Sequence, residues 1–162
     1  MMGFHNRALP RFRRAFLALV CIFLCGEIAA ARDVAVVTCR SNRVPVGMKS
    51  SDLIKTMKST HKWPGGSDLT VILTNPSSSE IRIVAEKLLS LTVGEFKEMI
   101  DEANKIRVTF LVVSSDDEVL KTVESNPSAI GLVNVYSITS NVDVLKIDDK
   151  LPLQTGYILH SQ

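Results

Sequence analysis

The stretch Leu69-Thr70-Val71-Ile72-Leu73-Thr74-Asn75-Pro76-Ser77-Ser78-Ser79, continued by residues 80–89, decides how this chain folds. An apolar, β-branched run is followed by a serine-rich turn and then by apolar residues at helical spacing. This order predicts a strand that leads into a helix through a turn of small hydroxyl residues. Such a turn directs backbone N–H and hydroxyl groups at the start of the helix, where the helix dipole favours a negative group.

Two interpretations of this turn follow from the residues alone. The turn is either a site for a small anion or a ligand carboxylate, or a plain helix cap made by Asn75, Ser77 and Ser78. The choice between them depends on the rest of the chain.

Strands and helices alternate along the chain. The expected strands are residues 33–39, 69–73, 108–113, 129–133 and 142–147. The expected helices are residues 53–58, 80–89, 93–104 and 116–124. Ser51 or Asp52 is expected to cap the first helix, and Thr92, with Glu95 three residues later, the third. The alternation predicts one α/β domain around a mixed or parallel sheet. Its first strand is expected at the centre of the sheet and its last at an edge.

Residues 1–31 have the three parts of a secretory signal peptide: a basic segment, a short apolar run and small residues just before Arg32. The alternative is a transmembrane anchor, which needs roughly 20 apolar residues. The apolar run here, residues 15–26, is well short of that length. We therefore expect a signal peptide over residues 1–31 and a domain over residues 32–162. The domain is expected in the periplasm or secreted from a bacterial cell, without a membrane span. The pair Arg13-Arg14 leaves the general and the twin-arginine export routes open.

Composition excludes several partners. Residues 1–31 hold four Arg and one Glu, so residues 32–162 carry 15 basic and 16 acidic side chains, a net charge of about −1. No basic patch remains to bind nucleic acid.

Cys39 is the one cysteine after residue 31 and is expected to be a buried core residue. Trp63, in a Pro-Gly turn, is expected to pack on the sheet, with stacking on a ligand as the alternative.

Several stretches follow one another in an order that occurs in a known family. They are the helix 53–58, Trp63-Pro64-Gly65-Gly66, the strand 69–73 with its serine turn, Ser114-Ser115 before a helix containing Glu118-Val119-Leu120, and Asn126-Pro127-Ser128-Ala129-Ile130-Gly131. Together they resemble the phosphate-binding-protein branch of the type 2 periplasmic substrate-binding proteins, over residues 35–147. The resemblance implies a single-lobe, three-layer α/β sandwich, because those proteins close two lobes on their ligand and residues 32–162 suffice for little more than one.

The resemblance also implies a ligand site at two serine turns. Phosphate binders have an arginine, small residues and Ser-Gly-Thr at the start of this helix. Aligned on the strand, Thr74 takes the place of the arginine and Glu80 that of the final threonine, which leaves Arg82 as the expected cation. The expected ligand-binding residues are Thr74, Asn75, Ser77, Ser78, Ser79, Arg82, Ser114 and Ser115. Helix capping is the alternative for the last two.

The function implied is an exported, non-enzymatic solute-binding domain that holds a small oxyanion such as phosphate and works with an ABC transporter. The alternative is an exported interaction module that keeps the fold and docks on an envelope partner protein without binding a ligand. The two hypotheses differ in whether the isolated domain binds an anion.

No arrangement of residues predicts catalysis. His61 is expected to be solvated in a polar turn and His160 to be frayed near the C-terminus. No cluster of histidine, cysteine and carboxylate side chains has metal-ligand spacing, and no Gly-rich cofactor motif occurs. Residues 116–118 and 148–149 are typical of a helix start and a solvated turn. We therefore expect no enzyme activity, no metal and no cofactor.

Overall fold

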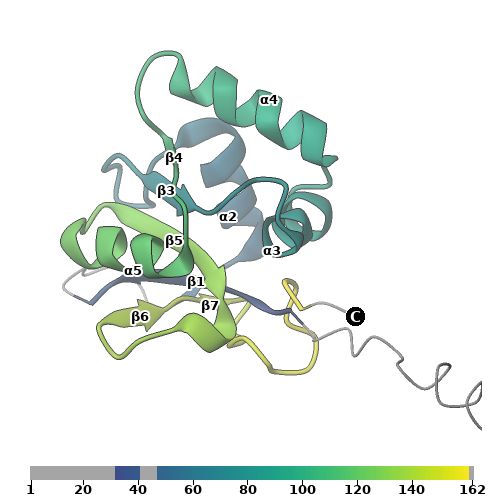
Figure 1. Ribbon diagram of the computed structural model, residues 1–162, viewed down its shortest axis with the longest axis vertical. Coiled ribbons are helices and arrows are strands. Elements are labelled where there is room, and N and C mark those ends of the chain that lie inside the picture. Colours follow the sequence, from purple (N-terminus) through teal and green to yellow (C-terminus); the bar gives the residue numbers. More distant parts are fainter. Residues whose placement is uncertain (1–31, 41–46, 161–162) are drawn as a thin grey trace, which may run out of the picture. The chain divides into compact units, whose positions relative to one another are not determined.

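The computed structural model describes residues 32–40 and 47–160 (Figure 1). These residues belong to one compact unit, residues 31–162. The expected signal peptide lies outside the described residues. Within them, no helix is long and apolar enough to cross a membrane.

A five-stranded sheet forms the centre of this unit, in the order β4-β3-β5-β1-β6. Its strands are β1 (Val34–Cys39), β3 (Thr70–Leu73), β4 (Phe110–Val112), β5 (Ala129–Asn134) and β6 (Val142–Val144). β3 is parallel to β4 and β5, whereas β1 is antiparallel to β5 and β6. A second, parallel pair consists of β2 (Gly47–Met48) and β7 (Lys146–Ile147). The prediction of a mixed sheet is confirmed.

Helices cover both faces of the sheet. They are α2 (Ser50–Lys55) with the π-helical η1 (Thr56–Thr60), α3 (Ser79–Ile83) with the π-helical η2 (Val84–Leu88), α4 (Val93–Asn104), α5 (Asp116–Ser125) and the short 3-10 helix η3 (Val135–Ser137). In Figure 1, α5 lies on one face, and α2, α3 and α4 lie on the other. The result is the three-layer α/β arrangement that was predicted.

The period-two pattern of β1 divides its side chains between two hydrophobic cores. Val34 and Val36 belong to the core beneath α2, α3 and α4, whereas Ala35 and Val37 belong to the core beneath α5. All six residues of β1 are buried. The expectation of an interior strand covered on both faces is therefore confirmed, and Cys39 is buried at its end.

Gly131 on β5 allows α5 to approach the sheet closely. A Cβ atom at this position would lie 2.7 Å from Val119 Cγ1, 2.8 Å from Val123 Cγ2 and 2.9 Å from Val37 Cγ2. No side chain larger than hydrogen fits there without moving the helix. The glycine thus allows α5 to pack closely on the sheet.

Two helix termini test the sequence rules. At α4 both halves of the predicted capping box form: Glu95 N donates to Thr92 Oγ1 at 3.3 Å, and Thr92 N to Glu95 Oε2 at 2.8 Å. At α2 the prediction of a Ser51 or Asp52 cap is wrong. The N-cap residue there is Lys49, and Asp148 accepts the Ser50 N–H at 2.9 Å from a turn far along the chain.

Strand lengths also differ from the prediction. The expected strand at 108–113 narrows to Phe110–Val112, and the one at 142–147 divides into β6 and β7. The division occurs at Leu145, which is 1% exposed and donates its N–H to Val36 O. The first part is the edge strand of the main sheet, as expected, and the second pairs with β2.

The two histidines are placed differently from the expectation. His61 is half-buried, with its ring edge-on to Phe110 at a centroid distance of 6.1 Å. Burial, together with the positive charge of Arg107, lowers the pKa of His61. His160 is not frayed: its Nδ1 lies 2.5 Å from Oδ1 of the buried Asp33, and the neighbouring Leu159 is fully buried.

Candidate functional site

The three parallel strands finish at one end of the sheet, which we call the carboxyl end. There β3 leads to the first serine turn (residues 74–79), and β4 leads to the second (residues 113–115). The two turns are adjacent, because Val113 N donates to Leu73 O at 2.9 Å. The antiparallel β1 begins at this same end, as the register Val34↔Asn134 shows. The candidate ligand residues on the two turns are therefore brought to one end of the sheet, as expected for strands in parallel.

The first serine turn is built by its own polar groups. Asn75 Oδ1 accepts the Ser77 N–H at 2.9 Å, and Asn75 O accepts the Ser78 N–H at 2.8 Å. Ser78 is the N-cap of α3, where its Oγ accepts the Ile81 N–H at 3.3 Å. Asn75 and Ser78 therefore serve the turn and the helix cap. Thr74 is half-buried at the beginning of the turn.

An arginine that the sequence analysis did not consider reaches this turn. Arg32, just before β1, donates from its guanidinium to Ser79 Oγ, and its Nε lies 3.8 Å from Glu80 Oε1. Ser79 Oγ is in turn 3.1 Å from Glu80 Oε2. The side chains of Arg32 and Glu80 are 51% and 25% exposed. A guanidinium, a hydroxyl group and a carboxylate therefore share the solvent-accessible start of α3.

Arg82, the cation expected at this site, behaves differently. Its side chain is exposed and forms no ion pair or hydrogen bond within the part of the chain that the structure describes. The long-range pairing of β1 with β5 is what brings Arg32 there instead. Predicting from the sequence that Arg32 reaches this turn would have required knowing how β1 pairs with β5.

The second serine turn already holds a carboxylate. Ser114 donates to Glu118 Oε2 through both its N–H, at 2.9 Å, and its hydroxyl group, at 2.6 Å. Ser115 is the N-cap of α5 and accepts the Glu118 N–H at 3.3 Å. The hydrogen bonds from the Ser114 hydroxyl and N–H lower the pKa of Glu118. The donors of this turn are thus occupied by a side chain of the same chain.

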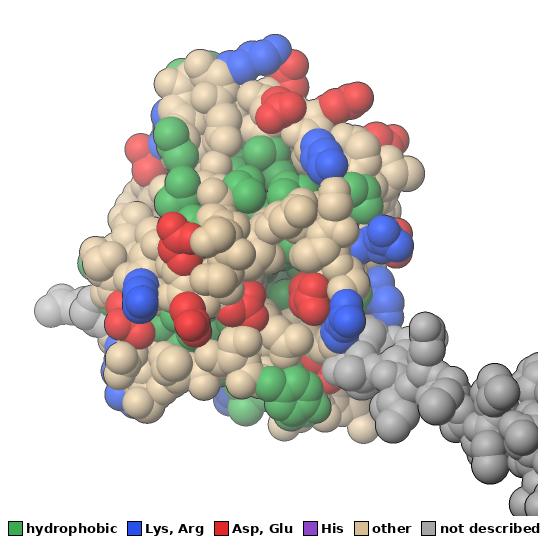
Figure 2. Space-filling model, in the orientation of Figure 1, with side chains coloured by type: hydrophobic (Ala, Val, Ile, Leu, Met, Phe, Trp, Pro, Cys, Tyr) green, Lys and Arg blue, Asp and Glu red, His purple; other side chains and the backbone are tan. Residues whose placement is uncertain are grey.

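Further polar groups connect the start of α5 to the end of β5. Asp116 Oδ2 accepts the Asn134 N–H at 3.0 Å and the Ser137 hydroxyl at 2.7 Å. Tyr136, in η3, is 74% exposed beside them. Figure 2 shows acidic and basic side chains mixed over the face that carries α5, without a continuous basic patch. Any anion at this end therefore depends on individual donors rather than on a broad positive surface.

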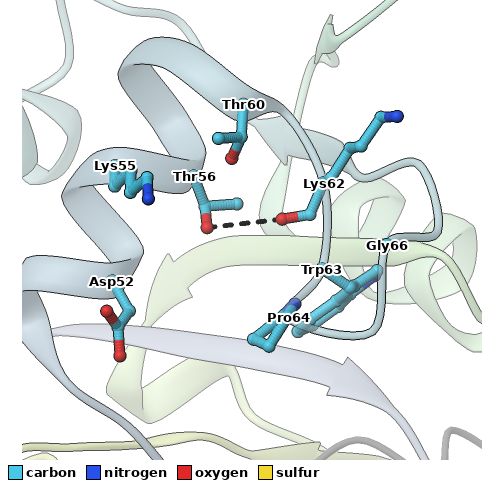
Figure 3. Close-up of a pocket in the computed structure, with 8 residues that line it drawn as sticks. All are labelled: Asp52, Lys55, Thr56, Thr60, Lys62, Trp63, Pro64 and Gly66. Atoms are coloured by element: carbon cyan, nitrogen blue, oxygen red, sulfur yellow. Dashed lines mark hydrogen bonds between the residues drawn. The ribbon is translucent and has the colours of Figure 1, made fainter.

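A pocket of about 400 Å³ lies at the opposite, amino end of the strands (Figure 3). It is lined by Asp52, Lys55, Thr56, Thr60, Lys62, Trp63, Pro64 and Gly66. Trp63 is 5% exposed, and its indole N–H donates to Ser128 O, just before β5, at 3.3 Å. The prediction that Trp63 packs on the sheet is confirmed. None of the eight ligand residues expected from the sequence lines this pocket.

The described residues contain no group of three or more histidine, cysteine or carboxylate side chains arranged to hold a metal ion. The chemistry available at the carboxyl end is hydrogen bonding and ion pairing from Arg32, Ser79 and the backbone. These groups can hold and orient a small ligand.

Comparison with known proteins defines the fold. No family model and no curated protein matches the sequence. Solved structures do match: an ABC-type phosphate transport receptor from Vibrio cholerae aligns with 81% of this chain and 54% of its own, at 21% identity and a TM-score of 0.61. A putative phosphate ABC transporter substrate-binding protein with bound phosphate, from Clostridium perfringens, aligns with 81% and 53%, at 14% identity and a TM-score of 0.66. PstS from Borrelia burgdorferi aligns with 82% and 55%, at 14% identity and a TM-score of 0.61.

The class of fold is thereby established. The chain has the phosphate-binding-protein type of substrate-binding fold in partial form, since it spans about half the length of these proteins. The resemblance noticed in the sequence is confirmed at the level of the fold. The similar structures are transport receptors and binding proteins by name, not enzymes.

Proposed function

We propose that this chain is an exported, non-enzymatic solute-binding lobe that binds a small oxyanion such as phosphate at the first serine turn. The observation that carries the proposal is the contact between the Arg32 guanidinium and the Ser79 hydroxyl at the start of α3. A guanidinium presents N–H donors in a planar fork that matches an oxyanion, and hydrogen bonds to a charged group are stronger than neutral ones. Ser77, Ser79 and the backbone of the turn supply the remaining donors, with Thr74 and Arg82 at the margin of the site.

Glu80 sets the strength of this site. Its carboxylate lies beside Arg32 and competes with the ligand for the same guanidinium. A dianion has to displace or neutralise this contact, so binding to the lobe alone is weak. In this proposal Ser114 contributes only when the Glu118 carboxylate leaves its two donors, and Ser115 contributes only when its hydroxyl is released from capping α5.

The cellular role follows from the fold and the N-terminal pattern. The signal-peptide pattern of residues 1–31 supports export, and the similarity to phosphate transport receptors supports a part in ABC transport. Because the chain spans about half of those proteins, a transporter or another envelope protein covering the carboxyl end is the partner that the proposal implies.

Isothermal titration of residues 32–162 with phosphate at low salt tests the proposal. We expect saturable binding that Arg32→Ala weakens at least tenfold, because a hydrogen bond to a charged group contributes about 1.5–3 kcal/mol. Arg40→Ala is the matched control, since Arg40 is also an exposed arginine next to β1 but pairs with Asp143 elsewhere. Equal affinity of the Arg32 and Arg40 variants, or no binding at millimolar phosphate, would reject the oxyanion site.

The second candidate function is docking on an envelope protein without a ligand. The exposed Tyr136 beside the acidic start of α5 favours it, because aromatic side chains are common anchors of interfaces. Capture of an envelope protein that is lost in Tyr136→Ala, together with an absence of phosphate binding, would favour this function over the first.

A further inference from the structure

The pocket at the amino end has walls that are formed before any ligand arrives. One wall is the loop of residues 62–68, in which Trp63 N donates to Ser67 O and Gly66 N to Trp63 O, both at 2.8 Å. Arg107 fastens this loop from outside: its guanidinium pairs with Asp68 and donates to His61 O at 2.9 Å. Together with the buried indole of Trp63, these contacts fix the loop.

The opposite wall is the helical segment α2 and η1. Thr56 joins the two walls, because its hydroxyl donates to Lys62 O at 3.4 Å (Figure 3). The segment η1 is π-helical, and such segments occur often at functional sites. The space between the walls, about 400 Å³, falls within the range of small-molecule sites.

Opposite charges stand side by side on this helical wall. Asp52 and Lys55 are three residues apart on α2, so their side chains leave the same face of the helix, and both line the pocket. In the part of the chain that the structure describes, neither forms an ion pair. The pocket therefore presents a carboxylate and an ammonium group that are not bonded to each other.

The remaining lining limits what the pocket can hold. Figure 3 shows the Lys62 side chain pointing away from the cavity, so a second ammonium group is not directed at a dianion there. Trp63 is nearly buried and offers apolar wall rather than an open face for stacking a sugar or a base. Thr60 adds a hydroxyl group, and Pro64 an apolar surface.

We propose that this pocket binds a small zwitterion of the α-amino acid type. The ligand carboxylate contacts the Lys55 ammonium and the Thr60 hydroxyl, the ligand ammonium contacts the Asp52 carboxylate, and the hydrocarbon part rests on Trp63 and Pro64. This site is separate from the serine turns and does not depend on the proposed oxyanion site, because it lies at the other end of the sheet.

Titration of the ¹⁵N-labelled protein, expressed from residues 1–162, tests this site by amide NMR shifts with glycine, L-valine and L-leucine. We expect saturable shifts confined to residues 52–66, with L-valine or L-leucine favoured over glycine. Isovalerate lacks the ammonium group and isobutylamine lacks the carboxylate, so each should bind at least tenfold more weakly than L-valine.

Variants locate the two charges. Asp52→Asn and Lys55→Met should each weaken L-valine binding at least tenfold. Lys58→Met is the matched control, because Lys58 is on the same helical segment but does not line the pocket. Unchanged amide spectra outside the substituted segment show that the variants are folded.

The proposal is overturned if none of the three amino acids gives saturable shifts at tens of millimolar, if the one-charge analogues bind equally well, or if Lys58→Met has the same effect as Lys55→Met. A phosphate titration of the same variants should be unaffected, which separates this result from the oxyanion site.

Discussion

The two serine turns at the carboxyl end look alike in sequence and differ in what they offer to a ligand. Each follows a parallel strand, and each contains the serine that caps the next helix, Ser78 in the first and Ser115 in the second. In the second turn Glu118 stands three residues after the cap, and its carboxylate reaches back to both donors of Ser114. In the first turn Ile81 stands at that position and is buried, so no side chain reaches back.

The acid of the first turn is displaced by one residue. Glu80 stands two residues after the Ser78 cap, where its carboxylate accepts the Ser79 hydroxyl and lies beside Arg32, and it leaves the backbone donors of the turn uncovered. The comparison teaches that a serine turn is open or closed according to the residue three positions after its cap, as the capping-box rule implies. The first turn also contacts a cation that is distant in sequence, Arg32, which lies just before β1.

Among the changes that test this comparison, the largest effect is expected from removing the acid of the open turn. Glu80→Gln should strengthen phosphate binding about tenfold, or about 1.4 kcal/mol, because it removes a charge that repels the anion and competes for Arg32. Titration calorimetry of wild type and variant measures the difference. Glu86→Gln, an exposed glutamate of η2, is the control. Equal gains in both variants would attribute the effect to net charge rather than to this contact.

The caps of the two turns should have comparable effects on stability. Ser78→Ala and Ser115→Ala each remove a hydroxyl acceptor at a helix start, so each should lower the free energy of unfolding by about 1 kcal/mol. Urea unfolding followed by circular dichroism gives both values. Only Ser78→Ala should also weaken phosphate binding, because its cap holds the start of α3, where Ser79 and Arg32 form the proposed site. A loss of phosphate binding in Ser115→Ala would contradict the view that the second turn is closed.

The pH dependence of the closed turn is the smallest expected effect. The hydrogen bonds from Ser114 lower the pKa of Glu118 below its ordinary value of 4.5. The stabilisation by the carboxylate is therefore fully present above about pH 4.5, and it is lost as the pH falls through the lowered pKa of the folded protein. Urea midpoints of wild type and Glu118→Gln should differ above pH 4.5 and converge below it. A difference that persists unchanged at pH 3 would show that the ionised carboxylate is not responsible.

Local chemistry was predictable where partners are close in sequence. The Thr92–Glu95 capping box formed completely because both groups lie within one helical turn. The burial of β1 on both faces was predictable from its near-continuous run of apolar, β-branched residues. The candidate ligand residues other than Arg82 could be located on the two turns because each turn directly follows an expected strand. Whether these residues bind a ligand stays a prediction.

Long-range contacts were beyond the sequence. Arg32 meets Ser79, 47 residues away, only because β1 runs antiparallel to β5. Asp148 caps α2 from a distance of 98 residues, which a rule based on Ser51 or Asp52 misses. His160, near the end of the sequence, pairs with Asp33, near the beginning of the domain sequence. In each case tertiary pairing supplied a group that no local pattern contains.

The position of β1 has a consequence for how the chain acquires its structure. This strand comes first in the sequence, yet it lies between β5 and β6, so Val34 pairs with Asn134 and Cys39 with Val142. Pairing residues so far apart in the sequence costs a large loop-closure entropy, and this cost makes folding slow. A ribosome that has made only the first hundred residues therefore holds a chain without its sheet centre. The completed fold has to wait until almost the whole polypeptide is free to collapse at once.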